Sequence, residues 1–97
     1  MITQIEILQT LAAHQAELRG KFTVKSLALF GSVARNEANE NSDIDVLVEF
    51  SAPVGLFEFL SLQEYLKDLL GRKVDLVTPA ALKPQLRDRI LQEAVYA

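Results

Sequence analysis

Cysteine is absent from this sequence of 97 residues. The chain can therefore hold neither a disulfide framework nor a zinc site built on cysteine, and this composition fits a cytoplasmic protein. A run of about 18 apolar residues is also lacking, so no segment is expected to span a membrane. The opening residues include an early acid, Glu6, and no basic stretch, which indicates an amphipathic helix rather than a signal peptide.

Histidine is scarce, and two common phosphate-binding motifs are missing. The only histidine, His14, lies in the expected first helix, so we assign it to structure or surface rather than to catalysis. Neither a Ser-His-Asp set nor a Cys-His set can then be assembled. There is no GxxxxGKS/T run and no GxGxxG run, which excludes phosphate sites of those two types.

Charge is unevenly distributed along the chain. Residues 36–66 contain seven acidic residues and no Lys or Arg, whereas six of the ten basic residues lie between Lys67 and Arg89. The net charge of −3 argues against binding nucleic acid by charge alone, so no direct nucleic-acid binding is expected. The distribution fits an ordinary solvated surface, and it equally fits an acidic centre that needs cations beside basic groups that attract an anion.

Hydrophobic periodicity and turn residues divide the chain into a few elements. Thr3 and Glu6 match a capping box at the start of a helix, Gly20 and Gly71 are plausible helix stops, and Pro84 suits a first helical turn. We expect helices over residues 3–19, 56–70 and 84–95, a short helix over 33–37, and strands over 24–30, 44–50 and 73–78.

The order of these elements predicts an α+β domain of two layers. A mixed sheet of about three strands would carry helices mainly on one face, and its other face would stay partly open. The length of the chain favours one domain over residues 1–97. Alternation in the second strand sends two sets of side chains to opposite faces: Ile44, Val46, Val48 and Phe50 to one, and Asp43, Asp45, Leu47 and Glu49 to the other.

Three carboxylates are the first candidate site residues. Asp43 and Asp45 share a face at the start of one strand, and Asp75 would join them if the second and third strands are neighbours. Ionised carboxylates this close repel one another, and magnesium, which prefers oxygen ligands and substrate phosphates, removes that repulsion. A third carboxylate would let two metals, about 3.5–4 Å apart, share ligands for phosphoryl-type transfer.

A glycine–serine pair after the first strand supplies a candidate nucleotide site. Gly31 lets the backbone approach an anion closely, and the Ser32 hydroxyl can donate a hydrogen bond to a phosphate oxygen. Arg35 lies about one helical turn on, where it can neutralise phosphate charge or hold the acidic loop that follows. Each feature alone is commonly a cap, a loop or a surface ion pair, so the prediction depends on their combination.

That combination resembles a known signature. Gly31-Ser32, ten residues, and then Asp43-Ile44-Asp45 resemble the nucleotidyltransferase superfamily that includes DNA polymerase beta. Within it, the runs GSVAR, SDIDVLVEF and KVDLVTP are similar to the minimal nucleotidyltransferases (MNT). These are small bacterial and archaeal proteins, often the antitoxin partner of a HEPN-domain ribonuclease toxin. The resemblance extends over nearly the whole chain.

The resemblance implies a fold, an activity and a role for each matching residue. The fold would be polymerase beta-like, Gly31 and Ser32 would hold the nucleotide triphosphate, and Asp43 and Asp45 would ligate Mg²⁺. Asp75 matches the third carboxylate, which helps to bind the catalytic metal and to activate the acceptor hydroxyl. The implied activity is Mg²⁺-dependent transfer of AMP from ATP to a tyrosine hydroxyl of the HEPN toxin, which makes the chain a protein adenylyltransferase and an antitoxin in a hetero-oligomer.

Two rival functions remain open from the sequence. The chain can act as a non-catalytic antitoxin that silences its toxin by complex formation alone, or it can transfer a nucleotide to a small molecule or an RNA end. Three carboxylates on one face favour the enzyme. The apolar residues of the helix over 56–70 also form a set too broad for one buried face, so we expect part of this set to contact a partner.

Overall fold

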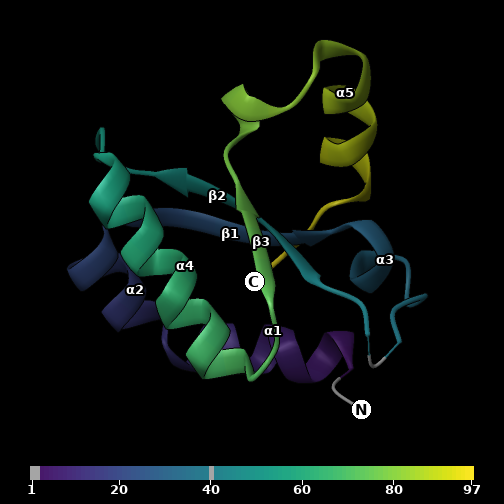
Figure 1. Ribbon diagram of the computed structural model, residues 1–97, viewed down its shortest axis with the longest axis horizontal. Helices are drawn as coiled ribbons and strands as arrows, with labels where there is room; N and C mark the ends of the chain where they lie inside the picture. The colour runs from purple at the N-terminus through teal and green to yellow at the C-terminus, as the bar shows by residue number, and fades with distance from the viewer. Residues whose placement is uncertain (1–2, 40) are drawn as a thin grey trace.

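The computed structural model describes residues 3–39 and 41–97, and Figure 1 shows its α+β architecture. The structure contains the following elements: α1 (Gln4–Ala13), α2 (Gln15–Phe22), β1 (Val24–Phe30), α3 (Gly31–Ala34), β2 (Ile44–Phe50), α4 (Leu56–Leu70), β3 (Val74–Val77), the 3-10 helix η1 (Pro79–Ala81), α5 (Pro84–Glu93) and β4 (Val95–Tyr96). The expected fold class is confirmed.

The sheet is mixed and has the strand order β3-β2-β1-β4 among the described residues. β1 pairs with β2 and with β4 in antiparallel fashion, and β2 pairs with β3 in parallel. The expected ranges of the two central strands are confirmed residue for residue, and β3 is one residue shorter at each end than expected. The sequence allowed the second and third strands to be neighbours, and the structure shows that they are.

The sheet has one strand more than expected because the last helix ends early. Residues 84–95 were predicted to be helical, but α5 ends at Glu93 and Ala94 is extended, with φ −62° and ψ 135°. Val95 and Tyr96 then pair with Leu29 and Ala28 of β1. A β-branched residue followed by an aromatic one suits a strand, and the exposed edge of β1 supplies the hydrogen-bonding partner that makes it one.

The hydrophobic core lies between one face of the sheet and three helices. Figure 1 shows α1, α2 and α4 gathered along one side of the sheet, while α5 stands apart from them above α3. The predicted inward set is confirmed for Ile44, Val46 and Val48, which are fully buried. The core is completed by side chains from these three helices, from the neighbouring strands and from α3: Ile7, Leu11, Leu18, Val24, Leu27, Leu29, Val33, Leu62, Leu66, Leu70, Val74 and Leu76.

The first helix is not continuous over residues 3–19 as predicted. Thr3 does cap it, since its Oγ1 accepts a hydrogen bond from the Glu6 amide at 3.2 Å. At His14, however, the backbone leaves the helical region, with φ −106° and ψ 15°, and Nδ1–H donates to the Thr10 carbonyl at 2.9 Å. The second helix then runs through Gly20, the expected stop, and ends at Thr23 in a left-handed conformation.

The long helix α4 has the predicted bounds, and Gly71 ends it with a positive φ of 67°. Its buried side chains are Leu62, Leu66 and Leu70. At its N-terminal half, Phe57 is 84% exposed and Leu56 is 70% exposed. The set is thus broader than one buried face, as predicted, while contact with a partner stays a prediction. No helix in residues 3–39 and 41–97 is long and apolar enough to cross a membrane.

Candidate active site

Gly31 joins β1 to α3 and lies directly against the carboxylate of Asp45. Its φ is +71°, a left-handed conformation that glycine adopts without a steric penalty. A Cβ at this position would overlap Asp45 Oδ2 and lie 3.1 Å from Asp45 Cγ. Two separate constraints therefore favour glycine here. The pairing of Phe30, the last residue of β1, with Asp45 of β2 places the Asp45 side chain next to Gly31.

Asp45 and Asp75 are direct neighbours on paired strands. The parallel register of β2 and β3 aligns these two residues. Their side chains lie on the face opposite to the one that buries Ile44, Val46 and Val48, because strand residues alternate. Asp45 is partly buried and Asp75 is exposed. On the same face Leu47 is buried, so this face is covered at its centre and open beside Asp75.

The electrostatics of Asp45 link the three predicted carboxylates. Burial is the main cause that raises the pKa of Asp45 to about 6, and the negative charges of Asp75 and Asp43 raise it further. The positive charge of Arg35 acts in the opposite direction. Asp43, Asp75 and Arg35 therefore all lie close enough to Asp45 to act on its charge, although the four residues are spread over positions 35–75 of the sequence. A bound cation would relieve the repulsion among the carboxylates.

Asp43 precedes β2 and is turned toward a lysine. Its Oδ2 lies 3.7 Å from Lys73 Nζ, and both side chains are exposed. Within the described part of the chain, no three His, Cys, Asp or Glu side chains are arranged so that they enclose a metal ion as they stand. The donor set nevertheless fits Mg²⁺, which takes one or two carboxylates and fills its other positions with water or phosphate oxygens.

Ser32 lies in the short helix α3, which extends from Gly31 to Ala34 rather than over the predicted residues 33–37. The helix is anchored from within by buried Val33 and from outside by Gln4, whose Nε2 donates to the carbonyls of Val33 at 3.3 Å and Ala34 at 2.9 Å. The Ser32 carbonyl accepts a hydrogen bond from the Glu37 amide at 2.8 Å. The Gly31-Ser32 pair is therefore held beside Asp45 by contacts to α1 and to the following loop.

Arg35 caps the end of α3 and pairs with two acids. Its Nε lies 3.1 Å from Glu37 Oε2, and its Nη1 lies 3.5 Å from Glu93 Oε2 at the end of α5. Glu93 Oε1 in turn lies 3.5 Å from Arg89 Nε. Of the two roles considered from the sequence, the hold on the acidic loop is the one observed here. Binding of phosphate stays a prediction.

Three residues around the site were not identified from the sequence: Gln4, Arg72 and Glu93. Gln4 and Glu93 contact α3 from opposite ends of the chain, and Arg72 donates two hydrogen bonds to the loop that leads into β2. Their partners are 29 to 58 positions away in sequence. No local pattern marks such residues, because their roles follow from the tertiary arrangement.

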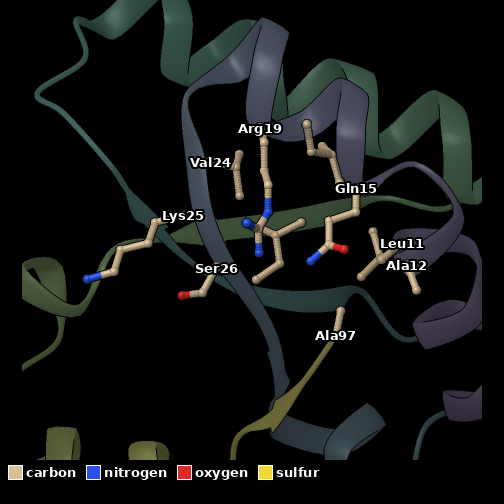
Figure 2. Close-up of a pocket in the computed structure, with 10 residues that line it drawn as sticks. Leu11, Ala12, Gln15, Arg19, Val24, Lys25, Ser26 and Ala97 are labelled. Atoms are coloured by element: carbon tan, nitrogen blue, oxygen red, sulfur yellow. The ribbon is translucent and has the colours of Figure 1, made fainter.

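A small pocket of about 110 Å³ lies elsewhere, between α1, α2, β1 and the C-terminal residue. Figure 2 shows Gln15 and Arg19 directed from α2 into this space, with Ser26 on β1 and Ala97 at its rim. None of the residues that line the pocket belongs to the carboxylate group or to α3. We therefore place the candidate active site at the open, acidic side of β2 and β3.

Comparison with known proteins places these features in a family. A family model described as a nucleotidyltransferase domain matches residues 11–97. A protein adenylyltransferase, MntA, from Thermococcus cleftensis is 46% identical over 96 residues, which cover 99% of this chain and 97% of that protein.

Solved structures give the same result. A structure described as a minimal nucleotidyltransferase is 40% identical, with a TM-score of 0.75, and covers 91% of this chain and 93% of its own. A tri-AMPylated Shewanella oneidensis HEPN toxin in complex with MNT antitoxin has a chain with a TM-score of 0.68 at 18% identity, covering 97% of this chain and 71% of that chain. The latter likeness is one of fold.

Proposed function

This chain belongs to the nucleotidyltransferase domain family, and we propose that it is an antitoxin. In this proposal it transfers AMP from ATP to a tyrosine hydroxyl of a HEPN-domain toxin. The chain is a nucleotidyltransferase of the minimal type, which rests on its likeness over nearly its full length to MntA and to a minimal nucleotidyltransferase of 40% identity. The nucleotide, the metal, the acceptor residue and the partner are the parts that we propose.

One observation carries the proposal: Asp45 and Asp75 are paired across two parallel strands, and Gly31 lies against the Asp45 carboxylate. This arrangement places two acidic groups beside the turn that carries Gly31 and Ser32, the pair predicted to hold the triphosphate. A nucleotidyl transfer needs both parts, because a phosphate must be held while its negative charge is balanced. A protein that only bound a toxin would have no physical need for mutually repelling carboxylates at this position.

The proposed reaction replaces one bond to phosphorus by another. The tyrosine oxygen forms a bond to the α-phosphorus of ATP, the bond from that phosphorus to the bridging oxygen of the β-phosphate breaks, and pyrophosphate leaves. The phenolic proton must be removed as the new bond forms. Asp75 is exposed beside Asp45, so its carboxylate is the group that we assign to hold the acceptor hydroxyl and take its proton.

Mg²⁺ would be held by Asp43 and Asp45, with Asp75 as the third carboxylate, and when bound it would neutralise phosphate charge and polarise the phosphoryl oxygens. Three further residues of the chain are proposed to bind the triphosphate. Gly31 gives the triphosphate close access to the backbone, Ser32 donates its hydroxyl to a phosphate oxygen, and Arg35 supplies positive charge from the end of α3. The transferred AMP would add a bulky negative charge to the toxin, which would oppose RNA binding there.

The test is to mix this protein with its candidate toxin, Mg²⁺ and ATP labelled at the α-phosphate. We expect label on the toxin with the wild-type chain, and its loss with Asp45→Asn and Asp75→Asn. Tyr→Phe substitutions in the toxin would then identify the acceptor. Asp88→Asn is a matched control, because Asp88 is an exposed aspartate on α5 outside the carboxylate group, and we expect it to retain transfer.

Three results would redirect the proposal. A toxin that stays unlabelled but is silenced equally by wild type and by both aspartate variants would support neutralisation by complex formation. Label on RNA or on a small molecule, with none on the toxin, would move the acceptor to that class. Full transfer by Asp45→Asn would contradict the assigned site.

A further inference from the structure

Arg72 connects the turn after α4 to the loop that leads into β2. Gly71 reverses the chain in a left-handed conformation, and Arg72 follows it directly before β3. The Arg72 Nη2 donates to two backbone carbonyls of the loop, that of Asn39 at 2.8 Å and that of Ser42 at 2.6 Å. Hydrogen bonds from a charged guanidinium are stronger than those between neutral groups, and the Ser42 bond is partly buried.

The loop has local hydrogen bonds of its own, but these do not join it to β3. The Ser42 amide donates to the Asn39 carbonyl at 3.1 Å, and the Asn39 amide donates to Ser42 Oγ at 3.1 Å. These bonds shape the turn without fixing where it lies relative to the sheet. Arg72 supplies that connection, because its side chain starts at the β3 end of α4 and reaches the loop carbonyls.

The position of Asp43 depends on this connection. β2 begins at Ile44, so Asp43 lies outside the strand and the β2–β3 ladder does not hold it. On one side of it, the Ser42 carbonyl is bound by Arg72. On the other side, the Ile44 amide donates to the Lys73 carbonyl at 2.9 Å. Two consecutive residues, Arg72 and Lys73, therefore hold the backbone on both sides of Asp43.

We propose that Arg72 is a positioning residue for Asp43: its two hydrogen bonds keep the Asp43 backbone at the edge of β3, where the carboxylate can join Asp45 and Asp75 around a divalent cation. Without Arg72, the loop would be free to move away from β3, and gathering the third carboxylate would cost conformational entropy. The inference rests on the proposed function in that it assumes a cation at these carboxylates.

The test measures cation binding separately from transfer. Mn²⁺ is used as a paramagnetic probe, and its dissociation constant is measured by electron paramagnetic resonance without nucleotide or toxin. We expect Arg72→Ala to weaken Mn²⁺ binding by about tenfold, a typical loss when a residue that supports a ligand is removed. Arg72→Lys, which keeps a charged donor, should bind Mn²⁺ with intermediate affinity. The Mg²⁺ concentration for half-maximal AMP transfer should rise from the wild type to Arg72→Lys and be highest for Arg72→Ala.

Arg19→Ala serves as the control, because Arg19 is an exposed arginine on α2 that lines the pocket remote from the carboxylates. It should leave Mn²⁺ affinity unchanged. A lower melting temperature for Arg72→Ala with wild-type Mn²⁺ affinity would overturn the proposal and leave Arg72 a purely structural role. If Arg72→Ala does not fold, wild-type Mn²⁺ affinity in both Arg72→Lys and Arg72→Gln would also overturn it. Normal Mn²⁺ binding by wild type without AMP transfer would instead contradict the proposed function.

Discussion

At the scale of single residues, Gly31 and Asp45 act as a pair. The glycine is needed for its positive φ and for the space that the Asp45 carboxylate occupies. The sequence shows only a glycine after a strand, which is common. The structure adds that this glycine packs against a carboxylate. The contact means that a change at position 31 acts on the candidate site directly, rather than only through folding.

Gly31→Ala is expected to disable the site and to destabilise the fold. A left-handed conformation costs a residue with a Cβ about 1–2 kcal/mol, and the Asp45 carboxylate would also have to move. A displacement of about 1 Å at a reacting centre reduces rates on the order of 100-fold, so we expect a loss of that size in AMP transfer. Urea unfolding and labelled transfer measure the two effects.

Gly20→Ala is the matched control, because a Cβ at position 20 meets nothing within 4 Å and the residue lies within α2. Alanine is favoured over glycine in a helix by roughly 0.5–1 kcal/mol. We expect a small gain in the free energy of unfolding and no change in transfer. Equal transfer by the two alanine variants would contradict the role assigned to Gly31.

The raised pKa of Asp45 predicts a pH dependence of stability in the absence of metal. The folded state binds the Asp45 proton more tightly than the unfolded chain does between the ordinary pKa of 3.8 and about 6. The free energy of unfolding should therefore decrease as pH rises through this window, because ionisation is less favourable in the folded state. Below the window this contribution to stability is fully present, and above it the contribution is lost.

Urea titrations of the wild type and Asp45→Asn across that pH range isolate the effect from other groups. The asparagine variant should gain stability relative to the wild type as pH rises. A constant difference between the two proteins at every pH would show that the pKa of Asp45 is not raised by folding.

At the scale of elements, α5 is joined to α3 through Arg35 and Glu93. The pair is exposed to solvent, so its direct contribution to stability is small. The position of the pair matters more than its strength. Arg35 acts on the charge of Asp45, and Glu93 at the end of α5 contacts Arg35, so the end of α5 borders the candidate site. The carboxylate of Glu93 and a bound triphosphate would compete for the same guanidinium.

Glu93→Gln should therefore strengthen ATP binding. Removing one negative charge beside Arg35 leaves the guanidinium more available to phosphate, and we expect the KM for ATP to fall by about two- to fivefold, in keeping with an exposed ion pair. Steady-state kinetics with the toxin as acceptor provide the measurement. The control is Glu64→Gln, the same charge change at an exposed position of α4, where the KM should not change. A rise in KM for Glu93→Gln would mean that Glu93 orients Arg35 instead of competing for it.

At the scale of the whole molecule, the parallel pairing of β2 with β3 assembles the site. This pairing brings Asp75 beside Asp45, although α4 separates the two strands in the sequence. The buried leucines of α4 hold that helix on the opposite face of the sheet. The core and the carboxylates therefore lie on opposite sides of the same two strands. A ligand at the carboxylates should stabilise the whole fold, because both strands must be in place for it to bind.

Mg²⁺ is accordingly expected to raise the melting temperature. A ligand that binds only the folded state at 100 times its dissociation constant adds about 2.7 kcal/mol to the free energy of unfolding. Thermal unfolding of the wild type should shift upward with Mg²⁺ and return with EDTA, and Asp45→Asn should show little shift. Asp88→Asn should behave as the wild type. A shift of equal size in Asp45→Asn would place the cation elsewhere.

Local patterns in the sequence were enough to predict the elements that have strong local signals. Alternation and turn residues were sufficient for β1, β2 and α4, and the Thr3 cap was also recognisable. The same patterns did not predict correctly where two of the helices end. The predicted helix over residues 3–19 is interrupted at His14, whose ring bonds to the Thr10 carbonyl, and the helix predicted to reach residue 95 gives way to β4, which pairs with the edge of β1.

The candidate site divides in the same way. Asp43, Asp45, Gly31 and Ser32 could be proposed from the sequence because they lie within 15 positions of one another, where spacing carries information. The pairing of Asp75 with Asp45, the contact between Gly31 and the Asp45 carboxylate, and the hold of Arg72 on the loop before Asp43 were decided only by the tertiary structure. Each of these depends on strand register and on contacts between distant segments, and a local pattern of residues does not specify either.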